Sequence, residues 1–469
     1  MQTLLSSSYK GFALPVLCCS VAAFISGLLL KIGPLMTVAL TAAVPILLFL
    51  LMDGKRFVYA QLLFCSFYKL LISDFGFPTV LNYVTDILTI ASLFYAVIET
   101  HKCKTKVFWG FTLIAIASFV VICFISAVSG GQSVLLSAWA IRNYFRLFAF
   151  FYSSVVLLDI DDLKIITKAS ALIYVLNILL GTFQGFVLNL GTDNISGLFG
   201  TESGGNAGMA LLITAATTFS VFGFVNDQIR ALPVLAIVVS SCFIAAIADL
   251  KVFFIELVVL LLMVVILNKP KLKGLLVVVV FPVVLTLAIT YFYSVSAEGK
   301  GFFSLDTIMD YAGSGGYSDD LTLNRFTAVS TLQSMFLHTP IRQVFGMGLG
   351  SGQYSQFFSS SLYATWGETL RWNWFTDALV FLETGWIGLV AYASIFISMS
   401  IGAFKCRLIV APEYSWLCRA AAAFSVFCLL MCVYNCVLTV EPGCYLAAFI
   451  LSIPYVLAKR VTYVKQEAN

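Results

Sequence analysis

Apolar stretches long enough to cross a bilayer recur along nearly the whole chain, and this recurrence limits the fold more than any other feature. A membrane-spanning helix takes about 20 predominantly apolar residues, so about fourteen such stretches would occupy roughly 280 positions. Hydrophobic residues make up 61% of the sequence and charged residues 11%, whereas soluble domains are about 45–50% apolar. We therefore predict an all-α polytopic membrane protein embedded in a lipid bilayer.

The predicted spans divide the chain into 1–295 with about eleven spans, a polar loop at 296–375, and 376–469 with about three spans and a tail. Too little chain remains for a soluble sugar transferase, a nucleotide-binding cassette or a DNA reader, each of about 100–200 residues, so no nucleic-acid partner is expected. No removable signal peptide is expected at the start. The spans are placed at 12–30, 34–52, 57–72, 79–98, 107–128, 143–158, 165–189, 207–225, 231–248, 252–268, 274–295, 376–404, 416–439 and 443–458.

Basic residues divide unevenly between the two sides of the predicted bundle. With the N-terminus in the cytoplasm, 18 of the 27 lysines and arginines and eight acidic residues fall inside, which gives +10 there. The other nine basic and fifteen acidic residues give −6. This distribution follows the positive-inside rule and predicts that both termini are cytoplasmic. Each basic residue on the acidic outer side then needs an acidic partner or an anionic ligand.

The long outer loop contains one periodic segment. Its apolar residues recur at three- and four-residue spacing between a polar start at 319–322 and Pro340, and this spacing predicts an amphipathic helix. Arg325 would stand at its start and His338 at its end. The helix either lies on the membrane surface or covers the bundle as a lid. The periodic residues are Leu323, Phe326, Val329, Leu332 and Phe336.

Two arginines mark the outer entrance of the sixth predicted span. Arg142 and Arg146 are four residues apart, so their like charges share one helix face at some cost in stability. They either hold a phosphate through bidentate hydrogen bonds, or reach lipid headgroups or an acid such as Glu202. The sequence leaves both interpretations open.

Lys251 lies in a short turn between two spans that are barely long enough to cross the bilayer. A cation held at this depth is a functional hypothesis by default. The alternative is a structural ion pair with Asp249 or Glu256. The sequence does not decide between the two.

The second half of the loop carries a histidine and a glycine run. His338 is either a general base near neutral pH or a group that caps a helix end. The run from Gly346 to Gly352 resembles a phosphate cradle, but it has no preceding strand, so a tight turn close to a lipid or sugar is favoured. The two histidines, His101 and His338, fall on opposite sides of the membrane, and no zinc site is expected.

Aromatic and acidic residues surround the start of the span at 376–404. The sequence 371–374, Arg371-Trp372-Asn373-Trp374, suits either sugar stacking or an interfacial aromatic belt. Asp377 follows directly, and Glu383 lies about two turns into the span, where a carboxylate is expensive. The acidic cluster at 159–162 is cytoplasmic and is interpreted as the charged start of a helix. The twelve cysteines mostly lie in apolar stretches and are expected to be free thiols.

The order and spacing of several motifs in 195–390 resemble the bacterial O-antigen polymerase and O-antigen ligase superfamily. These motifs are Gly197-Leu198-Phe199-Gly200 leading to Asn206, the turn cation Lys251, the loop arginine Arg325, the segment from Pro340 to Gly350, and Glu383-x-Gly385-x-x-Gly388 with Phe381 where the family often has leucine. Ligases place a catalytic His-Asn pair before the closing span, where this chain reads Trp372-Asn373-Trp374. That difference favours a polymerase.

The resemblance implies an architecture like that of membrane-embedded glycosyltransferases and an enzyme that acts on undecaprenyl-pyrophosphate-linked sugars. Such enzymes work at the outer face of the bacterial inner membrane without metal or cofactor. The resemblance implies that Lys251 and Arg325 grip the diphosphate, and it leaves the base among Glu202, His338, Asp377 and Glu383. Further substrate contacts are expected from Arg142, Arg146, Asn206, Arg342, Arg371, Trp372 and Trp374.

The implied activity is transfer of a growing O-antigen or capsule-type glycan from its undecaprenyl pyrophosphate carrier to another lipid-linked repeat unit. A chain-length regulator protein is a further expected partner. The alternatives are an O-antigen ligase and a flippase for lipid-linked oligosaccharides. Flippases usually have two similar halves with short loops, whereas this chain has one long loop in its C-terminal half.

Overall fold

The structure is a computed structural model that describes residues 46–102, 104–202, 205–268, 322–355, 357–440 and 442–462, with single positions at 41 and between 273 and 290. The predicted span at 12–30, most of those at 34–52 and 274–295, and the loop from 296 to 321 lie outside the described residues.

Within the described residues, ten helices of 16 to 31 residues form a bundle. They are α5 (Asn82–Lys102), α6 (Thr112–Gly130), α7 (Val134–Leu157), α8 (Ile160–Phe186), α9 (Asn206–Val225), α10 (Ala231–Ile247), α11 (Lys251–Leu267), α17 (Thr376–Cys406), α18 (Ser415–Tyr434) and α19 (Gly443–Ala458). The shorter helices are α3 (Gly54–Cys65), α4 (Tyr68–Ser73), α14 (Ala328–Phe336), α15 (Pro340–Phe345) and α16 (Glu368–Leu370).

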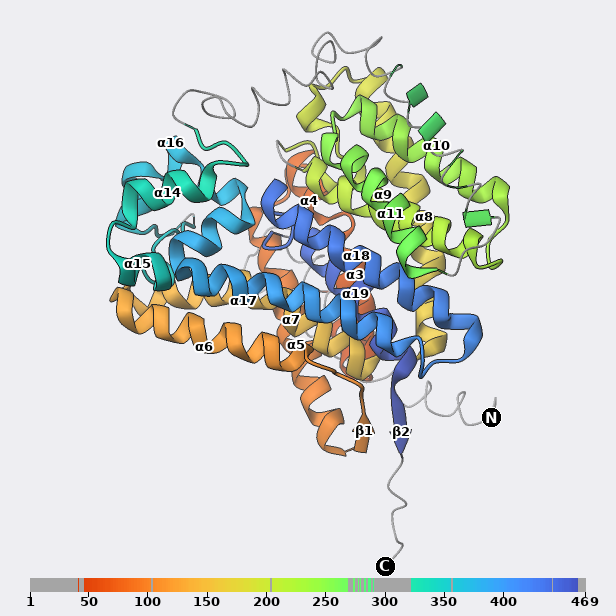
Figure 1. Ribbon diagram of the computed structural model, residues 1–469, viewed down its shortest axis with the longest axis horizontal. Coiled ribbons are helices and arrows are strands. Elements are labelled where there is room, and N and C mark those ends of the chain that lie inside the picture. Colours follow the sequence, from red (N-terminus) through yellow and green to blue (C-terminus); the bar gives the residue numbers. More distant parts are fainter. Residues whose placement is uncertain are drawn as a thin grey trace, which may run out of the picture.

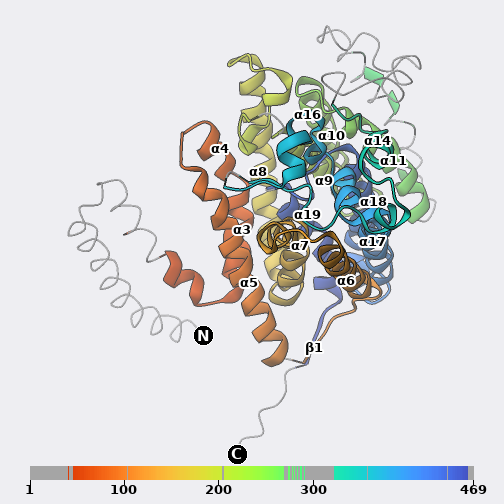
Figure 2. The same ribbon diagram turned by 90° about the vertical axis from the view of Figure 1, so that its left-hand side faces the viewer.

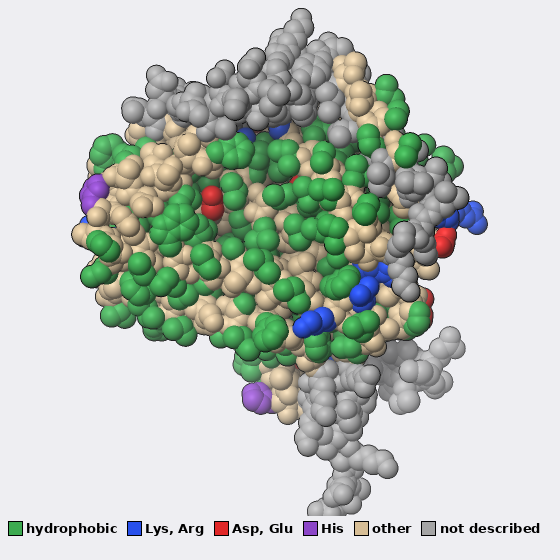
Figure 3. Space-filling model, in the orientation of Figure 1, with side chains coloured by type: hydrophobic (Ala, Val, Ile, Leu, Met, Phe, Trp, Pro, Cys, Tyr) green, Lys and Arg blue, Asp and Glu red, His purple; other side chains and the backbone are tan. Residues whose placement is uncertain are grey.

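Six segments of the described chain are long and apolar enough to cross a membrane. They are Thr79–Lys102, Thr112–Gly130, Ile160–Phe186, Asn206–Val225, Thr376–Cys406 and Pro412–Tyr434, while α10 and α19 are apolar but shorter. Figure 3 shows a face with many hydrophobic and few charged side chains, and the lysine and arginine side chains lie toward its edges. The predicted all-α membrane protein is confirmed at this level, and the count of about fourteen spans stays a prediction.

The long helices form two groups joined by α18 and α19. The first group is α5, α6, α7 and α17, and the second is α8 to α11 (Figure 1). α18 packs against both α17 and α9, and α19 packs against α7, α9 and α18. Almost every residue of α19 is buried. Figure 2 looks along α6, α7 and α17, which appear nearly end-on.

Short elements mark two ends of the molecule. α14, α15 and α16 gather at one end, which we call the loop end (Figure 1). At the other, the strand end, β1 (Lys104–Lys106) pairs antiparallel with β2 (Arg460–Thr462). These two strands form the only sheet among the described residues.

The strand end brings together charged residues that the sequence assigns to the cytoplasmic side. The Lys55 ammonium lies 3.2 Å from an Asp162 oxygen, and Lys459 donates to the carbonyls of Val156 at 2.9 Å and Leu158 at 2.6 Å. Asp159 caps α8 in a reciprocal capping box with Asp162. Such a box satisfies two helix-end donors, so the interpretation of 159–162 as a helix start is confirmed.

Most described helices match the predicted spans closely, with two differences near the site. The span predicted at 57–72 is two helices, α3 and α4, that break at Ser66 and Phe67. α7 begins at Val134 instead of 143, because the Ser133 hydroxyl accepts a hydrogen bond from the Leu136 amide and starts the helix there. Arg142 and Arg146 therefore lie well inside α7.

The amphipathic helix predicted in the loop is shorter than its periodic pattern. α14 begins at Ala328 because the preceding residues form a turn, in which the Asn324 side chain accepts from the Phe326 amide at 3.0 Å. Leu323 and Leu332 are buried, but Phe326 is 63% exposed. Arg325 thus lies in the turn before the helix instead of in its first turn.

Candidate functional site

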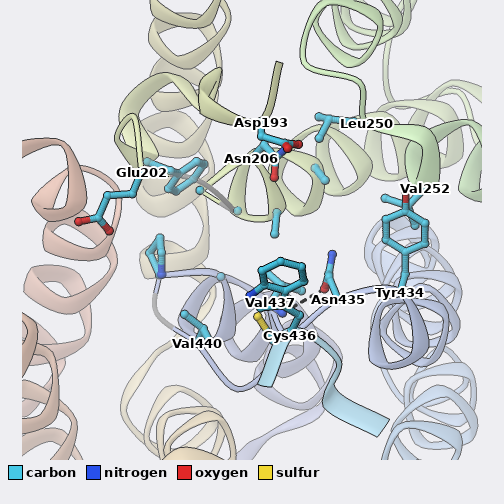
Figure 4. Close-up of a pocket in the computed structure, with 18 of the residues that line it drawn as sticks. Asp193, Glu202, Asn206, Leu250, Val252, Tyr434, Asn435, Cys436, Val437 and Val440 are labelled. Atoms are coloured by element: carbon cyan, nitrogen blue, oxygen red, sulfur yellow. Dashed lines mark hydrogen bonds between the residues drawn. The ribbon is translucent and has the colours of Figure 1, made fainter. Parts of the chain in front are cut away.

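A cavity of about 300 Å³ opens near the loop end, where elements from distant parts of the chain meet. It is bounded by α4, by the segment before α9, by the starts of α9, α11 and α19, by the turn before α14 and by the end of α18. We call it the polar pocket (Figure 4). Five of the predicted base and substrate-binding residues line it: Glu202, Asn206, Lys251, Arg325 and Trp374.

Three cations line the polar pocket, each from a different element. The Lys251 ammonium lies 3.0 Å from an Asp249 oxygen, and the Lys69 ammonium lies 3.7 Å from a Glu202 oxygen. The Arg325 guanidinium stacks over the Tyr434 ring, 4.0 Å from its centroid. These contacts hold the cationic groups at the pocket wall. They also mean that an anionic ligand would rearrange existing ion pairs there.

Three carboxylates line the polar pocket beside the three cations, and the starts of three helices add positive potential to it. Asn206 begins α9, Lys251 begins α11 and Gly443 begins α19, and all three residues line the pocket. A helix N-terminus carries unsatisfied amides and the positive end of the helix dipole, so it favours anions. Cations and helix starts together make this pocket suited to a phosphate or diphosphate.

The turn that presents Lys251 has a strained backbone. Asp249 adopts φ +51°, a left-handed conformation that is uncommon for residues other than glycine. The Leu250 amide donates to the Ala245 carbonyl at 2.8 Å, and the Lys251 amide donates to the Asp249 carbonyl at 2.9 Å. The turn thereby places the ammonium and the Asp249 carboxylate side by side at the pocket.

The motif Gly197-Leu198-Phe199-Gly200 fixes one wall of the polar pocket. The Gln184 side chain of α8 accepts from the Gly197 amide at 2.7 Å and donates to the Gly197 carbonyl at 3.0 Å. Gly200, at φ +86°, lies so close to the Lys69 backbone and the Ser73 hydroxyl that a side chain would crowd both. The motif therefore ties α8 to α4 and places Phe199 at the pocket.

The opposite wall combines aromatic rings with amides. Trp374, Phe375 and Tyr434 line it, together with Asn435 and Val437. Figure 4 shows Asp193 and Asn206 together on one side of the cavity, with Asn435 and Val437 facing them. The Asn206 amide lies 3.5 Å from an Asp193 oxygen. Rings beside carboxylates and amides are groups that bind sugars by stacking and hydrogen bonding.

Four residues of the pocket lining were not predicted from the sequence: Lys69, Asp193, Tyr434 and Asn435. A signal for Lys69 was present, since it is a lysine inside a predicted span, and such a cation is a functional hypothesis by default. Asp193, Tyr434 and Asn435 lie near span ends, where polar and aromatic residues are ordinary. No local pattern distinguishes them.

Arg142 and Arg146 do not line the polar pocket. Arg142 forms an ion pair with Asp86 of α5 at 2.7 Å, and its guanidinium lies over the Trp139 ring. Arg146 is buried and donates to the Thr439 carbonyl. The two side chains bind different partners, and these contacts offset the repulsion between guanidinium groups that their four-residue spacing predicts.

Glu383 is fully buried inside the bundle and does not line the polar pocket. One carboxylate oxygen accepts from the Tyr144 hydroxyl at 2.8 Å, and the other accepts from the Gly352 amide at 3.0 Å. Asp377 is also buried outside the pocket, and its side chain accepts from the Ala378 amide at 2.7 Å.

The glycine run of the loop docks on the helix that carries Glu383. The Met347 amide donates to the Leu382 carbonyl at 2.8 Å, and the Gly348 amide donates to the Glu383 carbonyl at 3.2 Å. α17 opens there because Gly385 has φ +67°. A Cβ at Gly346 would overlap the Glu383 carbonyl group. The Gly-x-Gly and Glu-x-Gly patterns thus form one docking contact between the loop and α17.

The remaining candidates lie around the loop and outside the polar pocket's lining. His338 and Arg342 are exposed. The Arg371 guanidinium lies 4.6 Å from the ring centroid of Trp374, which does line the pocket. Trp372 is buried, and its indole N–H donates to the Gly352 carbonyl at 3.0 Å.

Glu383→Gln should lower thermal stability. The amide keeps only one of the two acceptor oxygens of the carboxylate, so the unfolding free energy should fall by about 1–3 kcal/mol. Glu202→Gln, on a side chain that is about half exposed in the polar pocket, should change the stability little. Melting curves of both variants check this. Equal melting temperatures for Glu383→Gln and the unmodified protein would contradict it.

No protein-family model matches the sequence, and the comparison with curated proteins gave no match.

Proposed function

We propose that the protein is a polysaccharide polymerase that uses glycans carried on undecaprenyl pyrophosphate. The observation that carries this proposal is the meeting of Lys69, Lys251 and Arg325 with three helix starts around one cavity of a membrane protein. A lipid diphosphate is an anion that suits cations and helix starts in the wall of a membrane-embedded pocket.

The proposed reaction needs charge stabilisation at one end and an oriented hydroxyl at the other. The acceptor hydroxyl attacks the anomeric carbon of the donor glycan, and the bond from that carbon to the diphosphate oxygen breaks. The diphosphate leaves with the bonding electron pair, and fixed cations stabilise its developing charge. The hydroxyl proton passes to a base, for which the pocket offers the carboxylates of Asp193, Glu202 and Asp249.

The finer topology belongs to the same proposal. About fourteen spans with both termini in the cytoplasm would place the loop end, and hence the polar pocket, at the periplasmic face of the bacterial inner membrane. The architecture would resemble that of membrane-embedded glycosyltransferases. The charged strand end, with Lys55 and Lys459, supports this orientation because it gathers residues that the positive-inside rule assigns to the cytoplasm.

Purified full-length protein, supplied with a synthetic undecaprenyl-pyrophosphate-linked repeat unit, should form a polymer ladder without nucleotide sugar or added divalent metal. Mass spectrometry should show undecaprenyl pyrophosphate released once per linkage formed. The same protein in vesicles would test the flippase alternative: movement of the lipid-linked unit between leaflets, with no polymer, would overturn the proposal. Transfer only to a lipopolysaccharide core acceptor would select the ligase instead.

A further inference from the structure

A second cavity, of about 200 Å³, lies between α3 and α8, and we call it the apolar groove. Leu62 and Leu63 line it from α3, and Ile166 and Ile173 line it from α8. Leu212 of α9 lines it too and is buried, 4% exposed. Polar side chains are few in this lining, and one of them, the hydroxyl of Ser66 at the end of α3, donates to the carbonyl of Leu62.

The apolar groove adjoins the polar pocket. Phe199 and Pro442 line both cavities, so the two spaces meet at these side chains. Phe199 belongs to the segment that ties α8 to α4, and Pro442 precedes α19. Phe199 is 4% exposed and forms part of the wall between the two cavities, so the apolar lining begins directly behind the polar pocket.

The groove opens sideways and is closed toward the strand end. Leu63 and Ile165 lie on its opposite walls and are 58% and 59% exposed, so the groove opens at the surface of the bundle between them. Toward the strand end, Tyr59 lines the groove and its hydroxyl donates to Asp162, which also accepts from Lys55. This polar cluster ends the apolar surface.

We propose that the apolar groove holds the head-proximal part of the isoprenoid chain of a lipid diphosphate whose diphosphate lies in the polar pocket. The inference rests on the proposed function for the identity of this lipid. The occupant is chosen because the groove adjoins the polar pocket, whose wall holds Lys69, Lys251 and Arg325, and an anionic head followed by an apolar chain matches that order of surroundings. From Ile165 to Ile173 the groove wall is about 12 Å long, so the rest of a long chain leaves between Leu63 and Ile165 into the bilayer.

Photolabelling of the unmodified full-length protein tests the occupant directly. The probe is undecaprenyl diphosphate with a diazirine on an isoprene unit near the head. Adducts should map to the groove residues of α3 and α8, and excess unlabelled undecaprenyl diphosphate should suppress them. Adducts on the exposed face of α6, or equal labelling of the groove by a diazirine phosphatidylglycerol, would overturn the proposal.

A matched pair of variants gives an independent test. Ile173→Trp fills the groove, whereas Leu172→Trp adds the same ring at a neighbouring position that is 60% exposed and does not line the groove. Ile173→Trp should weaken binding of undecaprenyl diphosphate at least tenfold and leave binding of a short-chain alkyl diphosphate unchanged. Leu172→Trp should change neither. Equal affinities of Ile173→Trp and Leu172→Trp for the long-chain lipid would reject the groove.

Photolabelling of the groove and polymer formation are measured separately, so that the chain site and the proposed polymerase activity can fail independently. Labelling of the groove by a protein that forms no polymer would support the chain site and reject the polymerase. Polymer formation with labelling elsewhere would reject the chain site alone.

Discussion

Arg325→Ala should abolish long-chain polymer and leave single repeat units to accumulate on the carrier lipid. The guanidinium lines the polar pocket and is held over the Tyr434 ring, so it is positioned before substrate binds. Preorganised charge of this kind acts on the leaving group as its negative charge develops, and loss of one such group costs about 100- to 1,000-fold in rate. Gel ladders of the surface glycan, together with the amount of protein in the membrane, measure the effect.

The conservative and matched variants make this prediction specific. Arg325→Lys keeps the charge but loses the planar guanidinium, so a shortened ladder should remain. Arg342→Ala removes the same charge from an exposed position of the same loop, outside the pocket lining, and should leave the ladder unchanged. Lys251→Ala should follow Arg325→Ala. Ladders of normal length in both pocket variants would refute the diphosphate grip.

The sequence predicted most helix positions because apolar stretches and their polar ends are local features. α10 and α19 agree with their predicted spans to within one residue. The break between α3 and α4 was missed because Ser66 and Phe67 lie inside one continuous apolar stretch. That break matters, since α4 carries Lys69 to the polar pocket while α3 forms a wall of the apolar groove.

Which candidate residues meet at one cavity depends on contacts between distant segments of the chain. Local sequence patterns do not reveal such contacts. Lys251 and Arg325 were singled out as cations on the outer side, and the structure places both at one cavity. Arg142 had the same signal, but its carboxylate partner is Asp86 on another helix. Glu383 looked exceptional because an intramembrane carboxylate is expensive, and its hydrogen-bond donors come from α7 and from the loop. Charge alone therefore predicts which residues need partners but not which partners they have.

Gly346→Ala should destabilise the protein more than any other single substitution considered, because it separates the loop from α17. Gly346 has φ +79° and ψ −169°, a region that is essentially restricted to glycine. An added Cβ would also overlap the Glu383 carbonyl group, which cannot move without disturbing the α17 backbone. Backbone strain and overpacking should each lower the unfolding free energy by about 1–3 kcal/mol. The thermal unfolding transition in detergent should therefore move to a lower temperature.

Gly131→Ala is a control for the backbone strain that alanine causes at any glycine with a positive φ. Gly131 also has a positive φ, +60°, but no atom lies within 4 Å of the position that its Cβ would take. Its substitution should cost only about 1–2 kcal/mol for the left-handed backbone. If the two variants melt alike and the loop resists proteolysis equally in both, the loop does not depend on this contact. If Gly346→Ala alone exposes the loop, polymer formation should fall with it, because the same loop carries Arg325 to the polar pocket.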